Sequence, residues 1–165
     1  GFDPSRLTLE VTESTLMTEG DETLDILHRL RDVGIRIATD DFGTGYSSLA
    51  YLKRLPAKAL KVDKAFVDGL GTRLEDTALV TGIIGLASAL NFEIVAEGVE
   101  TEVQLRELRR LGCEYSQGYL HSRPLKAEDF EAWIGGDPAQ PATNGNRPRE
   151  VSGALSGVFD QNQTG

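Results

Sequence analysis

Short apolar segments rich in β-branched residues alternate with longer amphipathic segments about five times along the first 134 residues. The short segments, which we expect to be strands, lie near 7–11, 35–39, 59–62, 93–96 and 115–120. Between them, Leu and Ile recur at spacings of three and four residues, as in helices. Strands that alternate with helices pair in parallel, because each crossover helix returns the chain to the same end of the sheet. The sequence therefore predicts an α/β fold with a parallel sheet.

Capping residues and glycines mark the expected helix boundaries. Asp76 can open a long helix, and the spacing after it predicts a buried face formed by Leu79, Ile83, Leu86 and Leu90. Thr101 and Gln104 match a capping box, and Gly112 is a suitable stop for the helix that follows them. A closing helix is predicted over residues 127–134, with three apolar side chains available for packing: Phe130, Trp133 and Ile134.

The charge balance narrows the classes of partner. The chain of 165 residues carries 26 acidic and 17 basic residues, for a net charge of −9. An acidic surface disfavours binding to a nucleic-acid duplex, although a small phosphate ligand can still be held through metal ions. Cys113 is the only cysteine, so an internal disulfide is impossible and a cytoplasmic setting is expected. The sequence contains no apolar run long enough to predict membrane contact from this segment. Because the chain begins with Gly, we expect it to be part of a longer parent protein, which upstream segments could anchor in a membrane.

The composition changes after residue 134. Residues 135–165 are rich in Gly, Pro, Asn, Gln, Ser and Thr, which predicts a disordered tail beside a domain over residues 1–134. Truncation after Ile134 should therefore leave the melting temperature essentially unchanged in a thermal unfolding scan. A loss of several degrees would show that the tail packs on the domain.

Polar side chains end one predicted strand after another: Glu10, Asp40, Asp41, Lys61, Asp63, Glu97 and Gln117. In a parallel barrel these strand ends converge on one face, where active sites are built. Adjacent carboxylates such as Asp40 and Asp41 repel each other, and Mg²⁺, Mn²⁺ or Ca²⁺ can supply the counter-charge. Each residue alone could be a solvated loop charge, and Asp-Asp-Phe-Gly alone could be a chance likeness to a kinase motif. Their recurrence at successive strand ends favours a shared cleft.

Five motifs resemble, in order and spacing, those of the EAL-domain cyclic di-GMP phosphodiesterases. They are Glu10-Val11-Thr12-Glu13, the stretch from Asp40-Asp41-Phe42-Gly43 to Leu49, Leu60-Lys61-Val62-Asp63, Ala96-Glu97-Gly98-Val99-Glu100-Thr101 and Gln117-Gly118-Tyr119. The resemblance implies an α/β (β/α)8 TIM-like barrel of the EAL type with one antiparallel strand, present here as roughly the last five strands and helices. It also implies metal-dependent hydrolysis of cyclic di-GMP to the linear dinucleotide pGpG.

The resemblance also implies a role for each matching residue. Metal ligands would be Glu10, Asp40, Asp41 and Glu97, with Asp40 bridging two Mg²⁺ or Mn²⁺ ions. Catalytic residues would be Glu97, Lys61 and Gln117, which activate or hold the water and balance phosphate charge. Supporting residues would be Asp63, Glu13 and Glu100. Substrate-binding residues would be Gly118, Tyr119, Arg123 and Pro124.

The family's naming Glu-Ala-Leu signature and its upstream Asn ligand do not occur in this chain. We therefore expect the full-length parent to be the phosphodiesterase and this chain alone to be inactive. The resemblance further implies a homodimer that forms through the Asp-Asp-Phe-Gly loop. Two alternatives stay open: a degenerate EAL domain that binds cyclic di-GMP or a protein without hydrolysis, and an unrelated carboxylate-rich barrel such as a metal-dependent lyase.

Overall fold

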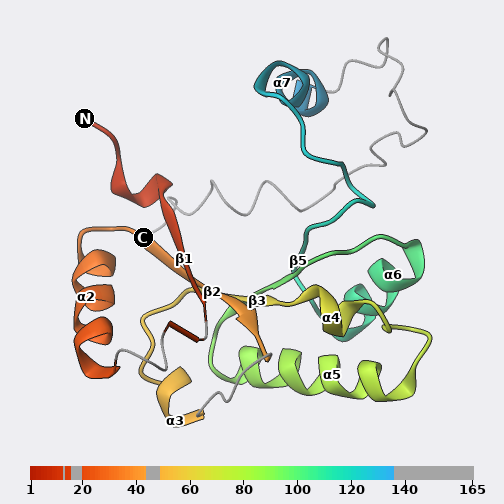
Figure 1. The fold of residues 1–165 in the computed structure, drawn as a ribbon, viewed down its shortest axis with the longest axis horizontal. Coiled ribbons are helices and arrows are strands. Elements are labelled where there is room, and N and C mark those ends of the chain that lie inside the picture. The colour runs from red at the N-terminus through yellow and green to blue at the C-terminus, as the bar shows by residue number, and fades with distance from the viewer. Residues whose placement is uncertain (13, 16–19, 44–48, 136–165) are drawn as a thin grey trace, which may run out of the picture.

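The computed structural model describes residues 1–12, 14–15, 20–43 and 49–135. Their sheet has five parallel strands that lie side by side in chain order, as Figure 1 shows. The strands are β1 Thr8–Thr12, β2 Arg36–Phe42, β3 Ala59–Val62, β4 Glu93–Ala96 and β5 Tyr115–Ser116. The predicted α/β fold with a parallel sheet is confirmed.

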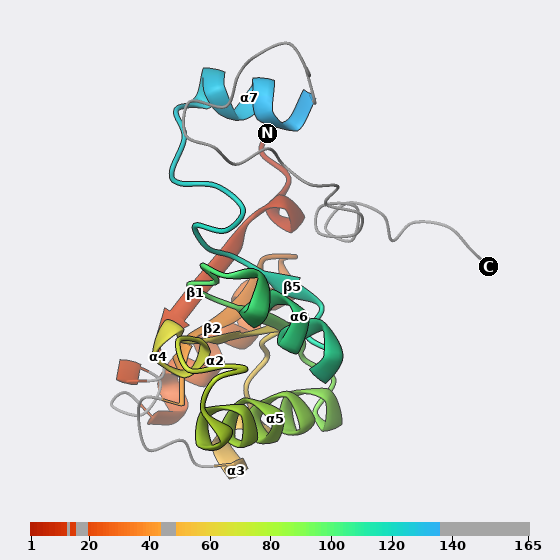
Figure 2. The same ribbon diagram turned by 90° about the vertical axis from the view of Figure 1, so that its right-hand side faces the viewer.

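Helical segments in the described part of the chain connect or flank these strands. They are η1 Pro4–Arg6, α2 Gly20–Asp32, α3 Leu49–Leu52, α4 Lys64–Val67, α5 Leu74–Ala89, α6 Glu102–Leu111 and α7 Ala127–Gly135. In Figures 1 and 2, α2, α5 and α6 lie beside the sheet, whereas α7 stands apart from it. Within the described residues, no helix combines the length and the apolar character that crossing a membrane requires.

The core lies between the sheet and the helices beside it. Leu60 on β3 and Ile94 on β4 are fully buried neighbours, and Val80 of α5 belongs to the same apolar cluster. Burying an aliphatic side chain of this size contributes about 1.5–3 kcal/mol. This packing holds the central strands rigidly, so the residues at their carboxyl ends have defined positions.

Three expectations about individual elements were wrong in detail. Helix α5 starts at Leu74, two residues before Asp76, and Leu79 is exposed. Its buried residues are Val80, Ile83, Ile84 and Ala87. Apolar side chains occur on every side of α5, so their spacing alone does not show which face is buried. Contact with β3 and β4 determines the buried face. The last strand ends at Ser116, because the chain turns over residues 118–121, where the His121 N–H donates to the Gly118 carbonyl.

Helix α7 also departs from expectation. Phe130 and Ile134 are exposed, so the expected packing on a core does not occur among the described residues. Instead, Phe130 stacks on Trp133 of the same helix, with ring centroids 6.1 Å apart. The capping box of α6 is present as predicted, since Thr101 accepts from the Gln104 N–H and Gln104 accepts from the Thr101 N–H.

Candidate active site

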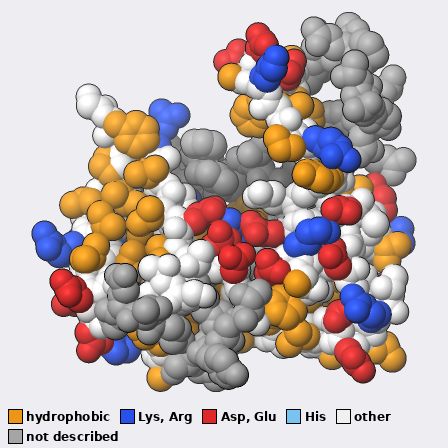
Figure 3. Space-filling view, viewed as in Figure 1, with side chains coloured by type: hydrophobic (Ala, Val, Ile, Leu, Met, Phe, Trp, Pro, Cys, Tyr) orange, Lys and Arg blue, Asp and Glu red, His pale blue; other side chains and the backbone are white. Residues whose placement is uncertain are grey.

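The carboxyl end of the sheet gathers charged side chains from four adjacent strands. β1 contributes Glu10, β2 contributes Asp40, β3 contributes Lys61, and Glu97 follows the last residue of β4. In Figure 3 acidic side chains form a patch at the centre of the face, between apolar and basic regions. Parallel pairing produces this convergence, because it places every strand's carboxyl end at one edge.

Lys61 lies at the centre of this group. Its Nζ is 2.7 Å from Glu10 Oε2, 2.8 Å from Glu97 Oε1 and 3.1 Å from Asp40 Oδ1. The Lys61 side chain is only 9% exposed. Burial alone would lower the pKa of Lys61, but hydrogen bonds to Glu10, Glu97 and Asp40 outweigh it and raise the pKa above its usual value. The ammonium is therefore charged at neutral pH and neutralises part of the cluster.

A β-bulge brings the two neighbouring aspartates to the same site. Thr39 pairs with Leu60 and Phe42 pairs with Val62, so Asp40 and Asp41 together face the single residue Lys61. Asp41 has a positive φ of 54°, which is rare for a residue with a side chain. Consecutive side chains on a regular strand point to opposite faces. The bulge removes that alternation and turns both carboxylates toward the strand ends.

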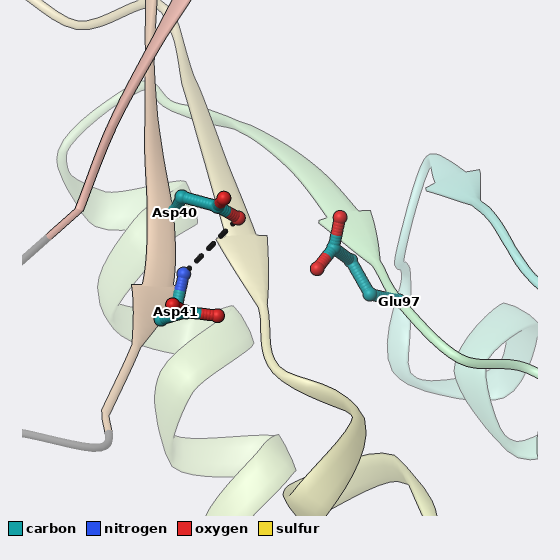
Figure 4. A group of neighbouring side chains, drawn as sticks. All are labelled: Asp40, Asp41 and Glu97. Atoms are coloured by element: carbon teal, nitrogen blue, oxygen red, sulfur yellow. Dashed lines mark hydrogen bonds between the residues drawn. The ribbon is translucent and has the colours of Figure 1, made fainter.

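Asp40, Asp41 and Glu97 form a group that fits a divalent cation. One carboxylate oxygen from each lies within 4.8 Å of the others. Figure 4 shows Asp40 and Glu97 pointing toward each other across β3, while the Asp41 backbone N–H donates to Asp40 Oδ1 at 3.2 Å. Burial and the nearby carboxylates of Asp40 and Asp63 raise the pKa of Asp41. Such a crowded set of oxygen ligands suits Mg²⁺, Mn²⁺ or Ca²⁺.

The residues expected to support the site occupy distinct places. Asp63 caps α4 by accepting from the Ala65 N–H at 2.7 Å, and it adjoins Asp41. Glu100 lies outside the acidic group and pairs with Lys64 at 3.1 Å. Glu13 lies outside the described residues, so its expected role stays a prediction.

Backbone hydrogen bonds hold Gln117 at the same end of the sheet. Its N–H donates to the Ala96 carbonyl at 2.8 Å, and its carbonyl accepts from the Val99 N–H at 3.0 Å. A side chain at Gly118 would collide with the backbone of Val99. This close approach ties the loop after β4 to the end of β5. The Gln117 side chain is exposed, and its role in orienting a water stays a prediction.

The expected substrate-binding residues lie beyond β5 on the surface. The Arg123 guanidinium is 4.6 Å from the centroid of the exposed Tyr119 ring, a cation–π contact. Pro124 is exposed beside this pair. His121 Nε2 is 2.8 Å from Ser116 Oγ, and burial lowers the pKa of His121.

Residues 1–124 match the EAL domain family. The chain belongs to the EAL domain family. Over 133 residues it is 54% identical to MucR of Pseudomonas aeruginosa, a bifunctional diguanylate cyclase/cyclic di-GMP phosphodiesterase. This match covers 81% of this chain and 19% of MucR.

Two solved structures of EAL proteins share the fold. The MucR phosphodiesterase in complex with cyclic di-GMP superposes with a TM-score of 0.75 at 53% identity, covering 78% of this chain and 52% of that one. A manganese and cyclic di-GMP complex of Klebsiella pneumoniae BlrP1 gives a TM-score of 0.70 at 36% identity, covering 75% of this chain and 32% of that one. This EAL chain thus spans about half of the solved MucR phosphodiesterase chain.

Two features of the site were not predicted from the sequence. The bulge at Asp40 and Asp41 depends on pairing with β3, and its only local signal is the adjacent pair of aspartates followed by Gly43. The contact of Lys64 with Glu100 joins residues 36 positions apart in sequence, and spacing could not have revealed it.

Proposed function

We propose that this EAL chain carries the metal-binding and catalytic half of a site that hydrolyses cyclic di-GMP to pGpG. The observation that supports it best is the convergence of Asp40, Asp41 and Glu97 on one point beside Lys61. The complexes of MucR and BlrP1 with cyclic di-GMP add support from related folds.

Each group in the site has work that suits this reaction. Water attacks phosphorus, one P–O3′ bond breaks, and the departing oxygen takes a proton to become a free 3′-hydroxyl. Lys61 would stabilise the negative charge that grows on the phosphoryl oxygens, because its ammonium stays protonated. Glu97 would accept the proton of the attacking water, and Gln117 would orient that water.

Asp40, Asp41, Glu97 and Glu10 would hold the divalent ions, Mg²⁺ or Mn²⁺. The bound ions would lower the pKa of the attacking water and balance the charge of the phosphodiester. The fit is chemical as well as geometric, since all four donors are carboxylates. The pair of Tyr119 and Arg123, with Gly118 and Pro124 beside it, would contact the guanine bases.

A second candidate function is binding of cyclic di-GMP without hydrolysis. Hydrolysis is favoured over binding alone, because the four carboxylates expected to hold metal are all present: Glu10, Asp40, Asp41 and Glu97. We also propose that the 165-residue chain alone is a poor catalyst, because solved EAL chains contain further helices and strands beside the part that this chain matches. Dimerisation through the Asp-Asp-Phe-Gly loop stays a prediction, since residues 44–48 lie outside the described residues.

The test is a chromatographic assay of the natural protein that contains this sequence, run beside the 165-residue chain. With Mn²⁺ or Mg²⁺ the natural protein should convert cyclic di-GMP to pGpG, and EDTA should abolish the conversion. The short chain should be much slower. Tight cyclic di-GMP binding with no turnover under any metal would support the receptor alternative, and metal-independent turnover would contradict the proposed chemistry.

A further inference from the structure

Lys64, the first residue of α4, contacts the loop that carries Glu97 in two ways. Its Nζ is 3.1 Å from Glu100 Oε1, and the same ammonium pairs with Asp68 one turn along α4. Its aliphatic stem lies against Gly98, where any added Cβ would overlap Lys64 Cβ and Cγ. The structure thus connects the helix after β3 with the loop after β4.

The position of Glu97 depends on the chain between residues 97 and 100. The Glu97 N–H donates to the Val62 carbonyl at 3.0 Å, which fixes the start of this loop against β3. Gly98 then turns with a φ of 67°, in the left-handed region that favours glycine. Beyond it, Val99 bonds to Gln117 and the Glu100 N–H donates to Gln104 Oε1 at 2.8 Å. Lys64 covers the turn at its centre.

We propose that Lys64 is a positioning residue: by clasping Gly98 and Glu100 it holds Glu97 at the place where the carboxylates meet. The consequence for catalysis rests on the proposed hydrolysis, whereas the consequence for metal binding rests only on the group of Asp40, Asp41 and Glu97. Hydrogen bonds to Asp68 and then to Glu100 raise the pKa of Lys64, so the clasp is charged at neutral pH.

The exposure of this ion pair separates positioning from folding. The Lys64 and Glu100 side chains are each 45% exposed, and exposed pairs of this kind contribute little to stability. If this ion pair only stabilised the fold, its removal would therefore leave the metal affinity unchanged. A residue that orients a ligand typically changes metal affinity by about ten- to a hundredfold when it is removed.

The test compares Lys64→Met with Lys58→Met in the natural protein that contains this sequence. Methionine keeps an unbranched stem and removes the charge. Lys58 is a matched control, because it is an exposed lysine whose Nζ is 3.5 Å from Glu93 at the opposite end of the sheet. Readouts are the Mn²⁺ dissociation constant by calorimetry, amide hydrogen exchange at Val99, the melting temperature in EDTA, and kcat and KM for cyclic di-GMP.

We expect Lys64→Met to weaken Mn²⁺ binding about tenfold and to speed exchange at Val99, with the melting temperature within about 2 °C of the original. We expect kcat to fall more than KM changes, Lys64→Arg to restore most of each property, and Lys58→Met to change none. Unaltered Mn²⁺ affinity and Val99 exchange in Lys64→Met would overturn the proposal. So would losses explained by a lower melting temperature. If the original protein binds Mn²⁺ but hydrolyses nothing, the proposed function fails while the binding and exchange data still decide the role of Lys64.

Discussion

Replacing Asp40 with asparagine should lower the rate of cyclic di-GMP hydrolysis on the order of a hundredfold or more. Asn keeps the shape of the side chain and can still accept a hydrogen bond from Lys61, whose Nζ lies 3.1 Å from Asp40 Oδ1. The change removes a negative charge from the group of Asp40, Asp41 and Glu97 that would hold the metal. The measurement is kcat/KM for the natural protein with saturating Mn²⁺, together with the Mn²⁺ dissociation constant.

Asp32→Asn is the matched control for this experiment. Asp32 is exposed at the end of α2 and pairs with its neighbour Arg31 at 2.8 Å; it precedes the amino end of β2, whereas Asp40 lies near the carboxyl end of that strand. The same chemical change there should leave hydrolysis and metal affinity as they were. Near-normal turnover by Asp40→Asn would contradict the assignment of Asp40 as a metal ligand.

Replacing Lys61 with methionine should destabilise the protein by about 3 kcal/mol when unfolding is measured in EDTA. The loss arises because three carboxylates would then crowd one another without the central ammonium. Glu10 is half-exposed, so water screens part of the repulsion and the effect stays at the lower end for a broken buried pair. Added Mn²⁺ should recover more stability in Lys61→Met than in the original protein, because a bound cation would restore the counter-charge.

The sign of the pH dependence follows from the pKa of Lys61. Since folding raises this pKa, the lysine stabilises the folded state below its unfolded pKa and loses that effect as pH rises through the higher folded value. The difference in stability between Lys61→Met and the original protein should therefore persist at pH 7.

The control for Lys61→Met is Arg36→Met. This change removes a half-buried cation from Glu93, which keeps its contact with Lys58, and it should lower the stability by only about 1 kcal/mol. Equal urea midpoints for Lys61→Met and the original protein would contradict the argument.

Several elements could be predicted because their signals are local. Ala59–Val62 and Glu93–Ala96 are strands with the predicted bounds, since short β-branched runs between polar turns are distinctive. The capping box of α6 depends only on Thr101 and Gln104, which are three residues apart. By contrast, the exposed Leu79 and the unpacked apolar side of α7 could not be predicted, because the partners that bury or expose a face are distant in sequence.

The sequence by itself determined which residues stand at the strand ends, and parallel pairing then brings Glu10, Asp40, Lys61 and Glu97 to one edge. Only the tertiary structure decided how they meet. The bulge opposite Lys61 places Asp41 beside Asp40, and the contact of Lys64 with Glu100 clasps the loop that carries Glu97. The physical reason is that the position of each strand and the residues that end it follow from local patterns, whereas register and side-chain distances depend on packing between segments that are remote in the chain.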